Sequence, residues 1–268
     1  MSRAVRLPGA GEPVRPPGAG EPVDALAAQQ RELIGLVADR DERDLSLPSR
    51  CAGWSAADVL LHLAQTNEMA VASVEDRLGE YVASVTDVIP SAGGIDDWAG
   101  ALVDAERAGA VAARDRYVTS AAAQEAAFRA VDPDHRVQWV AGEMAARTLA
   151  TTRLSETWIH TVDAAAAVGI DPEPTDRLWH VARLVWRTVP YALSRGGVTP
   201  TGDVAFELAG PRGGRWTFGE PDVAATVVRG PAVELCTVAG QRGDAASTEL
   251  VAAGPDAAAV LRLMRTFA

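Results

Sequence analysis

The chain has 268 residues, of which 48% are hydrophobic and 23% are charged, as in a folded globular protein rather than a disordered one. Its formal net charge of -11 leaves no excess of cations to bind nucleic-acid phosphates or an anionic membrane surface. The sequence contains no lysine, which excludes Schiff-base catalysis by a lysine side chain.

The first 23 residues contain a short duplication. The heptapeptide PGAGEPV occurs at residues 8–14 and again at residues 17–23. Such a Pro/Gly-rich segment cannot bury a core, so we expect a disordered tail over residues 1–23.

Helical periodicity begins at Asp24, which can cap a helix with apolar residues at helical spacing. Ser55 is a second N-cap candidate, before a helix over residues 56–78. Residues 98–130 are rich in alanine and are also expected to be helical.

Two further helices are predicted over residues 143–168 and 176–194, because glycines follow both segments. Together these segments indicate a helical bundle over residues 24–198, with short to moderate connections.

The pattern changes after Pro200. Residues 204–208 and 216–218 alternate between apolar and polar side chains, which predicts a hairpin, and residues 223–228 fit a third strand. Segments 231–242 and 255–266 are predicted to be helices. We therefore expect a small α+β domain over residues 199–268, and α+β as the fold class of the chain.

Three side chains on two predicted helices are candidate metal ligands. Glu156 and His160 are four residues apart, so they project about 40° apart on one helix face. His62 lies in the apolar helix that follows Ser55. Two imidazoles and a carboxylate suit zinc or another divalent metal. The alternative is a chance Glu/His pair with a hydrogen-bonded core histidine, because helical spacing does not establish that the two helices face each other.

A family resemblance supports the metal site. The segments CAGWSAADVLLHLA and, about ninety residues later, TRLSETWIHTVDAA resemble the mycothiol-dependent maleylpyruvate isomerase family. That family belongs to the DinB-like superfamily of metal-binding four-helix bundles. Its motifs are a GWS-type helix start followed by a histidine, and an ExxxH pair before an aspartate. The later stretches GRWTFGE and GPAVELCTVAGQR resemble the family's small C-terminal domain.

The resemblance implies a DinB-like bundle in which His62, Glu156 and His160 bind a metal ion, most often zinc. It also implies mycothiol as a possible cosubstrate, because family members use their metal to hold this low-molecular-weight thiol. By the same resemblance Arg242 is a candidate catalytic residue that anchors a substrate carboxylate. The alternative for Arg242 is an arginine that complements the dipole of its helix.

Helix geometry adds candidates around the triad. Asp58 is one turn before His62 and Asp163 is one turn after His160, so either can accept the second imidazole N–H, or be an exposed carboxylate. Arg153 is one turn before Glu156, where it either orients an anionic cofactor or substrate or forms a helix salt bridge.

The remaining cysteines and histidines match no motif. Cys236 is interpreted as a small buried hydrophobe. Cys51 is either a nucleophile or a small buried hydrophobe, and we favour the second because no basic neighbour is evident in the sequence. Two cysteines cannot form a disulfide framework, which fits a reduced cytoplasm. His135 is expected in a polar loop and His180 on a helix surface.

Three functions are compatible with these observations. The first is a metal-dependent isomerase or S-transferase that activates a thiol or water to attack a small electrophile. The second is a thiol-independent metalloenzyme, such as an isomerase, cyclase or hydrolase, and the third is a non-catalytic protein that binds a metal or small ligand. In each case the expected partner is a small molecule, without nucleic acid or membrane, and the chain is expected to be a monomer or homodimer.

Overall fold

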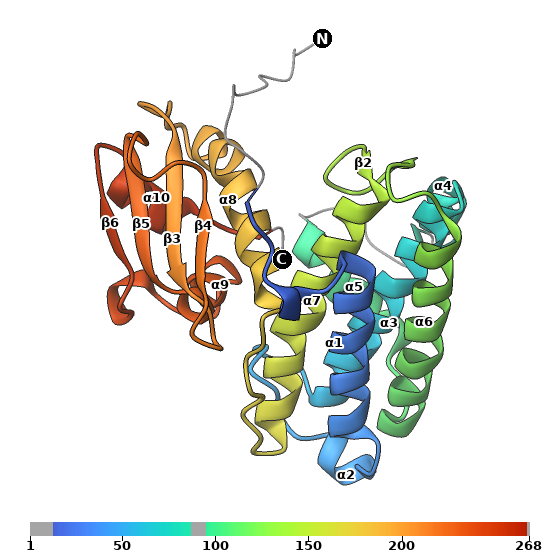
Figure 1. Cartoon of the computed structure of the whole chain (residues 1–268). Helices are drawn as coiled ribbons and strands as arrows, with labels where there is room; N and C mark the ends of the chain where they lie inside the picture. The colour runs from blue at the N-terminus through green and yellow to red at the C-terminus, as the bar shows by residue number, and fades with distance from the viewer. Residues whose placement is uncertain (1–12, 87–94, 267–268) are drawn as a thin grey trace. The chain divides into compact units, whose positions relative to one another are not determined.

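The computed structural model describes residues 13–86 and 95–266 (Figure 1). Contacts between Cα atoms divide these residues into two compact units. One unit is residues 21–173, and the other is residues 174–266 together with residues 13–20.

The first unit is a four-helix bundle. Its long helices are α1 (Pro22–Val37), α3 (Ala56–Val74), α6 (Ala110–Ala130) and α7 (Ala146–Ala167). Helix α3 packs on α6 and α7, and α1 packs on the same two helices, which closes the bundle. The core between them is built from fully buried apolar side chains, including Leu33, Val37, Leu60, Leu63 and Tyr117. The bundle predicted from the sequence is thereby confirmed.

Shorter elements connect the long helices: α2 (Glu42–Leu45), α4 (Leu78–Thr86), α5 (Ile95–Glu106), β1 (Arg136–Val137) and β2 (Met144–Ala145). The predicted helix over 56–78 ends at Val74, and Asp76 takes a φ of 57°, which a continuing α-helix does not allow. The helical region predicted over 98–130 is divided into α5 and α6. Helix α7 begins at Ala146 because the two preceding residues pair with β1.

The second unit is a four-stranded sheet with three helices. Its elements are α8 (Leu178–Arg195), β3 (Val204–Ala209), β4 (Arg215–Phe218), β5 (Thr226–Pro231), α9 (Ala232–Ala239), β6 (Val251–Ala253) and α10 (Ala257–Leu263), with short 3-10 turns η1 (Pro17–Ala19) and η2 (Ala245–Ser247). The strand order is β4-β3-β5-β6, in which only the β3–β5 pair is parallel. Together the two units confirm the predicted α+β class.

Helix α8 differs from the sequence prediction, which places it in the bundle and the boundary near residue 198. Its contacts assign it to the second unit, because it packs on β3, β4, α9 and α10. The apolar stripe that includes Val181 and Val185 is fully buried there. Periodicity shows that a helix has a buried face, but it does not show what covers that face. Strand β6 has no counterpart in the prediction, and β5 lies three residues later than expected.

The segment before α1 also differs in part from the predicted tail. Residues 1–12 lie outside the described residues, but residues 17–19 form η1 and α1 begins at Pro22. His180 on α8 is buried rather than on the surface, and its Nε2 lies 3.2 Å from Ala19 O and 3.0 Å from Gly20 O. His135 lies in the loop between α6 and β1, as expected, with its Nε2 3.6 Å from Asp76 Oδ2.

None of the described helices is both long and apolar enough to serve as a membrane span.

Candidate metal centre

The start of α3 determines where His62 lies. Gly53 takes a φ of 80°, a left-handed conformation that suits glycine, and the chain then enters the helix at Ser55. Ser55 and Asp58 form a reciprocal capping box: Asp58 N–H donates to Ser55 Oγ at 3.1 Å, and Ser55 N–H donates to Asp58 Oδ2 at 2.9 Å. Asp58 also accepts a bond from Arg107 Nε at 2.8 Å. It therefore caps and anchors the helix and is not the partner of His62 that the sequence suggested.

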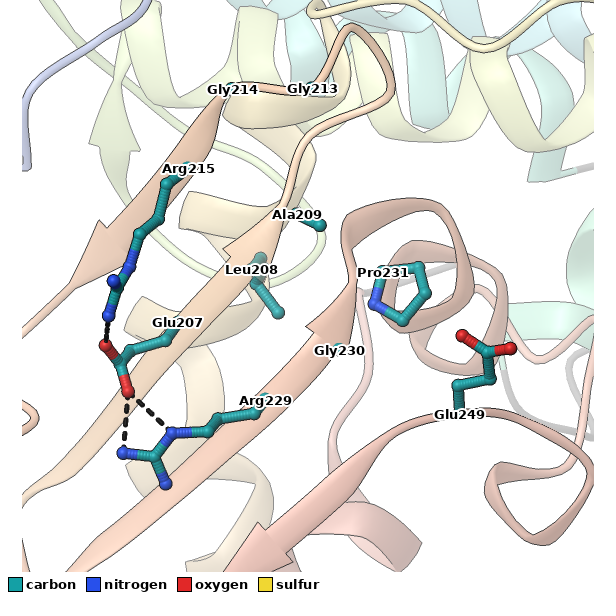
Figure 2. Close-up of a pocket in the computed structure, with 10 residues that line it drawn as sticks. All are labelled: Glu207, Leu208, Ala209, Gly213, Gly214, Arg215, Arg229, Gly230, Pro231 and Glu249. Atoms are coloured by element: carbon teal, nitrogen blue, oxygen red, sulfur yellow. Dashed lines mark hydrogen bonds and ion pairs between the residues drawn. The ribbon is translucent and has the colours of Figure 1, made fainter.

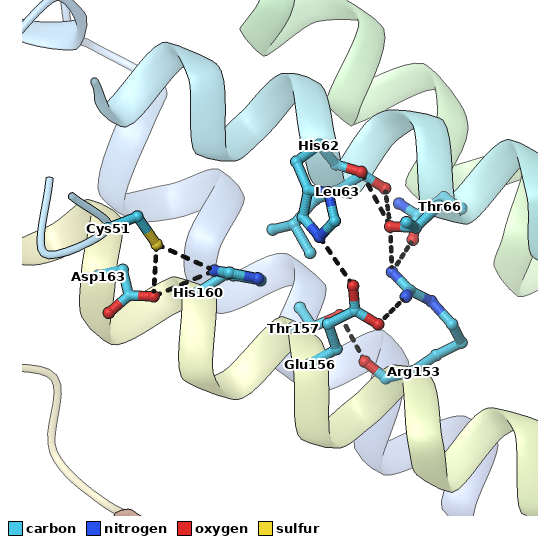
Figure 3. Close-up of polar contacts among 10 residues, drawn as sticks. Cys51, His62, Leu63, Thr66, Arg153, Glu156, Thr157, His160 and Asp163 are labelled. Atoms are coloured by element: carbon cyan, nitrogen blue, oxygen red, sulfur yellow. Dashed lines mark hydrogen bonds and ion pairs between the residues drawn. The ribbon is translucent and has the colours of Figure 1, made fainter. Parts of the chain in front are cut away.

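The three predicted ligands converge from α3 and α7. One ligand atom from each of His62, Glu156 and His160 can be chosen so that all three lie within 4.8 Å of one another. His62 Nε2 lies 2.9 Å from Glu156 Oε1, and the centroids of the two imidazole rings are 5.0 Å apart (Figure 3). Both histidines are only 8% exposed. The geometric hypothesis drawn from the sequence therefore agrees with the structure, while metal binding itself stays a prediction.

Arg153 holds the other oxygen of Glu156. Its guanidinium is fully buried; Nη1 donates to Glu156 Oε2, and Nη2 donates to Thr66 Oγ1 at 2.8 Å and Asn67 Oδ1 at 3.2 Å. These contacts join α7 to the helix that carries His62. Of the two roles considered for Arg153, the helix salt bridge is present, and its burial leaves no surface for a cofactor.

The same contacts determine the charge of Glu156. Burial alone would raise the pKa of this carboxyl, but the Arg153 charge and the hydrogen bond with His62 outweigh it and lower the pKa to about 2. Glu156 is therefore ionised at neutral pH. Because Arg153 occupies Oε2, the oxygen that faces the histidines is Oε1.

Asp163 orients the second histidine. Its Oδ2 lies 3.0 Å from His160 Nδ1, and its side chain is fully buried. A carboxylate at this place accepts the Nδ1–H and leaves the lone pair on Nε2, which is the tautomer a metal ligand needs. Burial lowers the pKa of His160 although the Asp163 contact opposes it, and this shift favours the neutral ring.

Cys51 is a member of this cluster that sequence reasoning missed. Its thiol donates to Asp163 Oδ2 at 3.1 Å and lies 3.7 Å from His160 Nδ1 (Figure 3). The side chain is partly exposed rather than a buried hydrophobe. The sequence around Cys51 does not indicate these neighbours, because both side chains lie on α7, more than a hundred residues later in the chain. Cys236, in contrast, is fully buried, as predicted.

The donor set fits a divalent cation. Two imidazoles and one ionised carboxylate oxygen are the ligands found in many catalytic zinc sites, where three protein ligands leave a fourth position open. Two of the three ligands also have a charged outer partner, Arg153 for Glu156 and Asp163 for His160.

Arg242 lies in the second unit, after α9, where its Nη1 donates to Gly240 O at 3.2 Å. Its proposed role in substrate binding stays a prediction. A hollow of about 500 Å³ on this unit lies over the sheet and is lined by residues including Glu207, Arg215 and Arg229 (Figure 2). Glu207 is paired with both arginines, and Glu249 in the same lining brings the formal charges to two of each sign.

Comparison with known proteins supports the same interpretation. A family model described as the mycothiol maleylpyruvate isomerase N-terminal domain matches residues 26–165, which include both motifs. Two Mycobacterium tuberculosis proteins described as uncharacterized, from strains CDC 1551 / Oshkosh and ATCC 25618 / H37Rv, are each 32% identical over 244 residues, 91% of this chain and 93% of the relative.

Two solved structures share the fold. A crystal structure of the mycothiol-dependent maleylpyruvate isomerase has a TM-score of 0.57 at 19% identity, covering 87% of this chain and 91% of that one. A histidine-to-alanine mutant of that enzyme gives a TM-score of 0.54 at 19% identity, with 83% and 88% covered. The resemblance noted in the sequence is confirmed.

Proposed function

The chain belongs to the mycothiol maleylpyruvate isomerase N-terminal domain family, and from that premise we propose that it is a metal-dependent enzyme of the isomerase or S-transferase type. In this proposal His62, Glu156 and His160 bind a divalent cation, with zinc as the resident metal. The cosubstrate is a low-molecular-weight thiol such as mycothiol, and the substrate is a small electrophile. The enzyme is expected to act in the cytoplasm.

A single observation supports the proposal most strongly. Donor atoms from three side chains on two helices lie within 4.8 Å of one another in a buried part of the bundle. Two imidazoles and a carboxylate that converge in this way are ligand types that a catalytic zinc ion takes in proteins.

Arg153 and Asp163 would hold the ligands in the charge state and orientation that a cation needs before it binds. Arg153 keeps Glu156 ionised and occupies Oε2, so that Oε1 is the ligand atom. Asp163 holds the Nδ1 proton of His160, which aims the lone pair of Nε2 at the site. Three ligands would then leave one coordination position for an exogenous group.

A bound dication would supply an electrostatic field that lowers the pKa of a thiol, so that the thiolate is present at neutral pH. In an isomerase the thiolate adds to one carbon of an activated alkene, rotation occurs about the resulting single bond, and elimination of the thiol restores the double bond. In a transferase the adduct is the product.

The test is metal analysis of the purified protein, combined with calorimetric titration of mycothiol into the zinc-loaded form. We expect one zinc per chain and saturable mycothiol binding. His62→Ala should abolish both, while His135→Ala, which changes a partly exposed histidine outside the cluster, should retain both. Zinc binding without mycothiol binding would refute the thiol-dependent reaction, and absence of zinc binding would refute the site.

A further inference from the structure

His160 belongs to two groups of potential ligands. One is the triad with His62 and Glu156, and the other consists of Cys51, His160 and Asp163. In the second group Cys51 Sγ lies 3.1 Å from Asp163 Oδ2 and 3.7 Å from His160 Nδ1, and Nδ1 lies 3.0 Å from Oδ2. Figure 3 shows the sulfur, the nitrogen and the oxygen directed toward one another.

These distances approach those of a tetrahedral metal site. Zinc bond lengths of about 2.3 Å to sulfur and about 2.0 Å to nitrogen or oxygen place the ligand atoms about 3.5 Å apart for pairs with sulfur and about 3.3 Å apart for the N–O pair, and a larger ion such as Cd²⁺ places them further apart. Each observed separation is within about 0.4 Å of its tetrahedral value. Small side-chain movements would therefore admit a cation.

The loop that carries Cys51 is held in place before any ligand binds. Cys51 N–H donates to Ser49 Oγ at 3.1 Å, and Trp54 N–H donates to Cys51 O at 3.0 Å. Arg50 N–H donates to Asp163 O at 3.3 Å, which fastens the loop to α7 beside the other two ligands. A preorganised loop reduces the entropy that ion binding would otherwise cost.

The two groups cannot use His160 at the same time. A neutral imidazole carries one ring proton, so only one of its nitrogens offers a lone pair. With the proton on Nδ1, Nε2 serves the triad; with the proton on Nε2, Nδ1 serves the group that contains Cys51. The sulfur ligand favours soft ions, whereas the triad contains only nitrogen and oxygen ligands.

We propose that Cys51, His160 and Asp163 form a second cation site for soft ions such as Cd²⁺, filled as an alternative to the triad. Binding displaces the Cys51 thiol proton to solvent and places the His160 ring proton on Nε2. The consequence is that a soft ion removes His160 from the triad and thereby releases the ion held there.

The experiment uses the full-length protein, freed of metal with a chelator and titrated with CdCl₂. The ultraviolet thiolate-to-cadmium charge-transfer band reports a sulfur ligand. His62→Ala weakens the triad but leaves the second group intact, so we expect this variant to develop the full band at one equivalent of Cd²⁺. In zinc-loaded wild type, one zinc should appear in a chelating dye for each cadmium bound.

Variants of the two cysteines separate the ligand from a general thiol effect. Cys51→Ser should lose the band and bind Cd²⁺ at least about 100-fold more weakly, since the loss of an outer partner alone costs 10–100-fold. Its affinity for Zn²⁺ should change less than about tenfold, because Cys51 is not in the triad. Cys236→Ser, which changes the other free cysteine, should retain the band.

Four results would overturn the proposal: no band in His62→Ala, a band that persists in Cys51→Ser, simultaneous binding of cadmium and zinc, or equal losses of Cd²⁺ and Zn²⁺ affinity in Cys51→Ser. The last would mean that Cys51 only supports Asp163. The His62→Ala band tests this proposal separately from the enzymatic one, because it does not require zinc or thiol binding by the triad.

Discussion

Replacement of Arg153 by methionine tests how the bundle tolerates a buried carboxylate. The change retains a long side chain but removes the cation beside Glu156 and the donors to Thr66 and Asn67. We expect the metal-free variant to be less stable than metal-free wild type at pH 7, with a difference that zinc reduces. A bound dication would supply the positive charge that the variant lacks.

The structure gives the magnitude in two ways. The difference between the ordinary pKa of 4.5 and the value of about 2 for Glu156 corresponds to about 3 kcal/mol of stability. Of the contributions that lower this pKa, the Arg153 charge is the largest, followed by the hydrogen bond with His62. Removal of one partner from a buried ion pair independently costs about 3–5 kcal/mol. We therefore expect a loss of about 3 kcal/mol.

The pH dependence follows from the sign of that shift. Because folding lowers the pKa of Glu156, its stabilising contribution is complete above pH 4.5 and is lost as the pH falls from 4.5 toward about 2. The difference between wild type and Arg153→Met should therefore be constant near neutrality and shrink below pH 4.5.

The assay is urea unfolding of the two proteins with a chelator and with saturating zinc. Arg116→Met is a matched control, since Arg116 pairs with Glu68 and Glu106 in the same unit but is one-third exposed. It should cost no more than about 1 kcal/mol, with no response to zinc. A loss below about 1 kcal/mol for metal-free Arg153→Met, or an equal loss with and without zinc, would refute the reasoning.

Three further predictions concern the outer partners, the second unit and the helix cap. Asp163→Ala should weaken zinc binding by about 10–100-fold in a competition assay with a chelating dye. An unchanged affinity would mean that Asp163 does not orient His160 for metal binding. Burial lowers the pKa of His180 from 6.5 to about 4, so wild type should lose about 3 kcal/mol of stability as the pH falls from 6.5 to 4; acid titrations of His180→Gln should lack this loss. Ser55→Ala removes the N-cap of α3 and should cost about 1 kcal/mol in urea unfolding, with Ser84→Ala on an exposed surface as the neutral control.

The ligand triad could be predicted because the sequence features that indicate it are mostly short motifs. Glu156 and His160 share a face by their spacing alone, and the GWS-type motif before His62 carries the family resemblance. The packing of α3 against α7 is a tertiary contact. It was predicted from the family resemblance and not from the periodicity of either helix. The structure shows the two helices in contact.

The roles of Arg153, Cys51 and Asp58 could not be settled from the sequence. The spacing of Arg153 predicts a salt bridge with Glu156, but not its contacts with Thr66 and Asn67 on another helix. Cys51 meets side chains of α7, while Asp58 turns back to cap its own helix. Such contacts depend on which helices become neighbours and on competition between local caps and distant partners.

The same dependence on tertiary contacts explains why the sequence placed α8 in the bundle. Its apolar stripe predicts a buried face, and a bundle offers one obvious cover, but the sheet that follows it supplies another. Alternation in β3 and β4 was sufficient to predict the sheet, yet the choice between helix and sheet as the partner of α8 depends on side-chain fit across the interface.

The charge balance around the triad gives a physical reason to expect a cation there. Arg153 contributes one positive charge, and Glu156 and Asp163 contribute one negative charge each, so these three side chains carry a net charge of -1. If these three side chains only stabilised the core, apolar residues would serve better, because buried ion pairs are often less stabilising than hydrophobic contacts. A negative net charge instead lowers the free energy of a dication placed among these ligands. Arg153→Met increases this negative charge, so it should strengthen zinc binding even as it destabilises the metal-free protein.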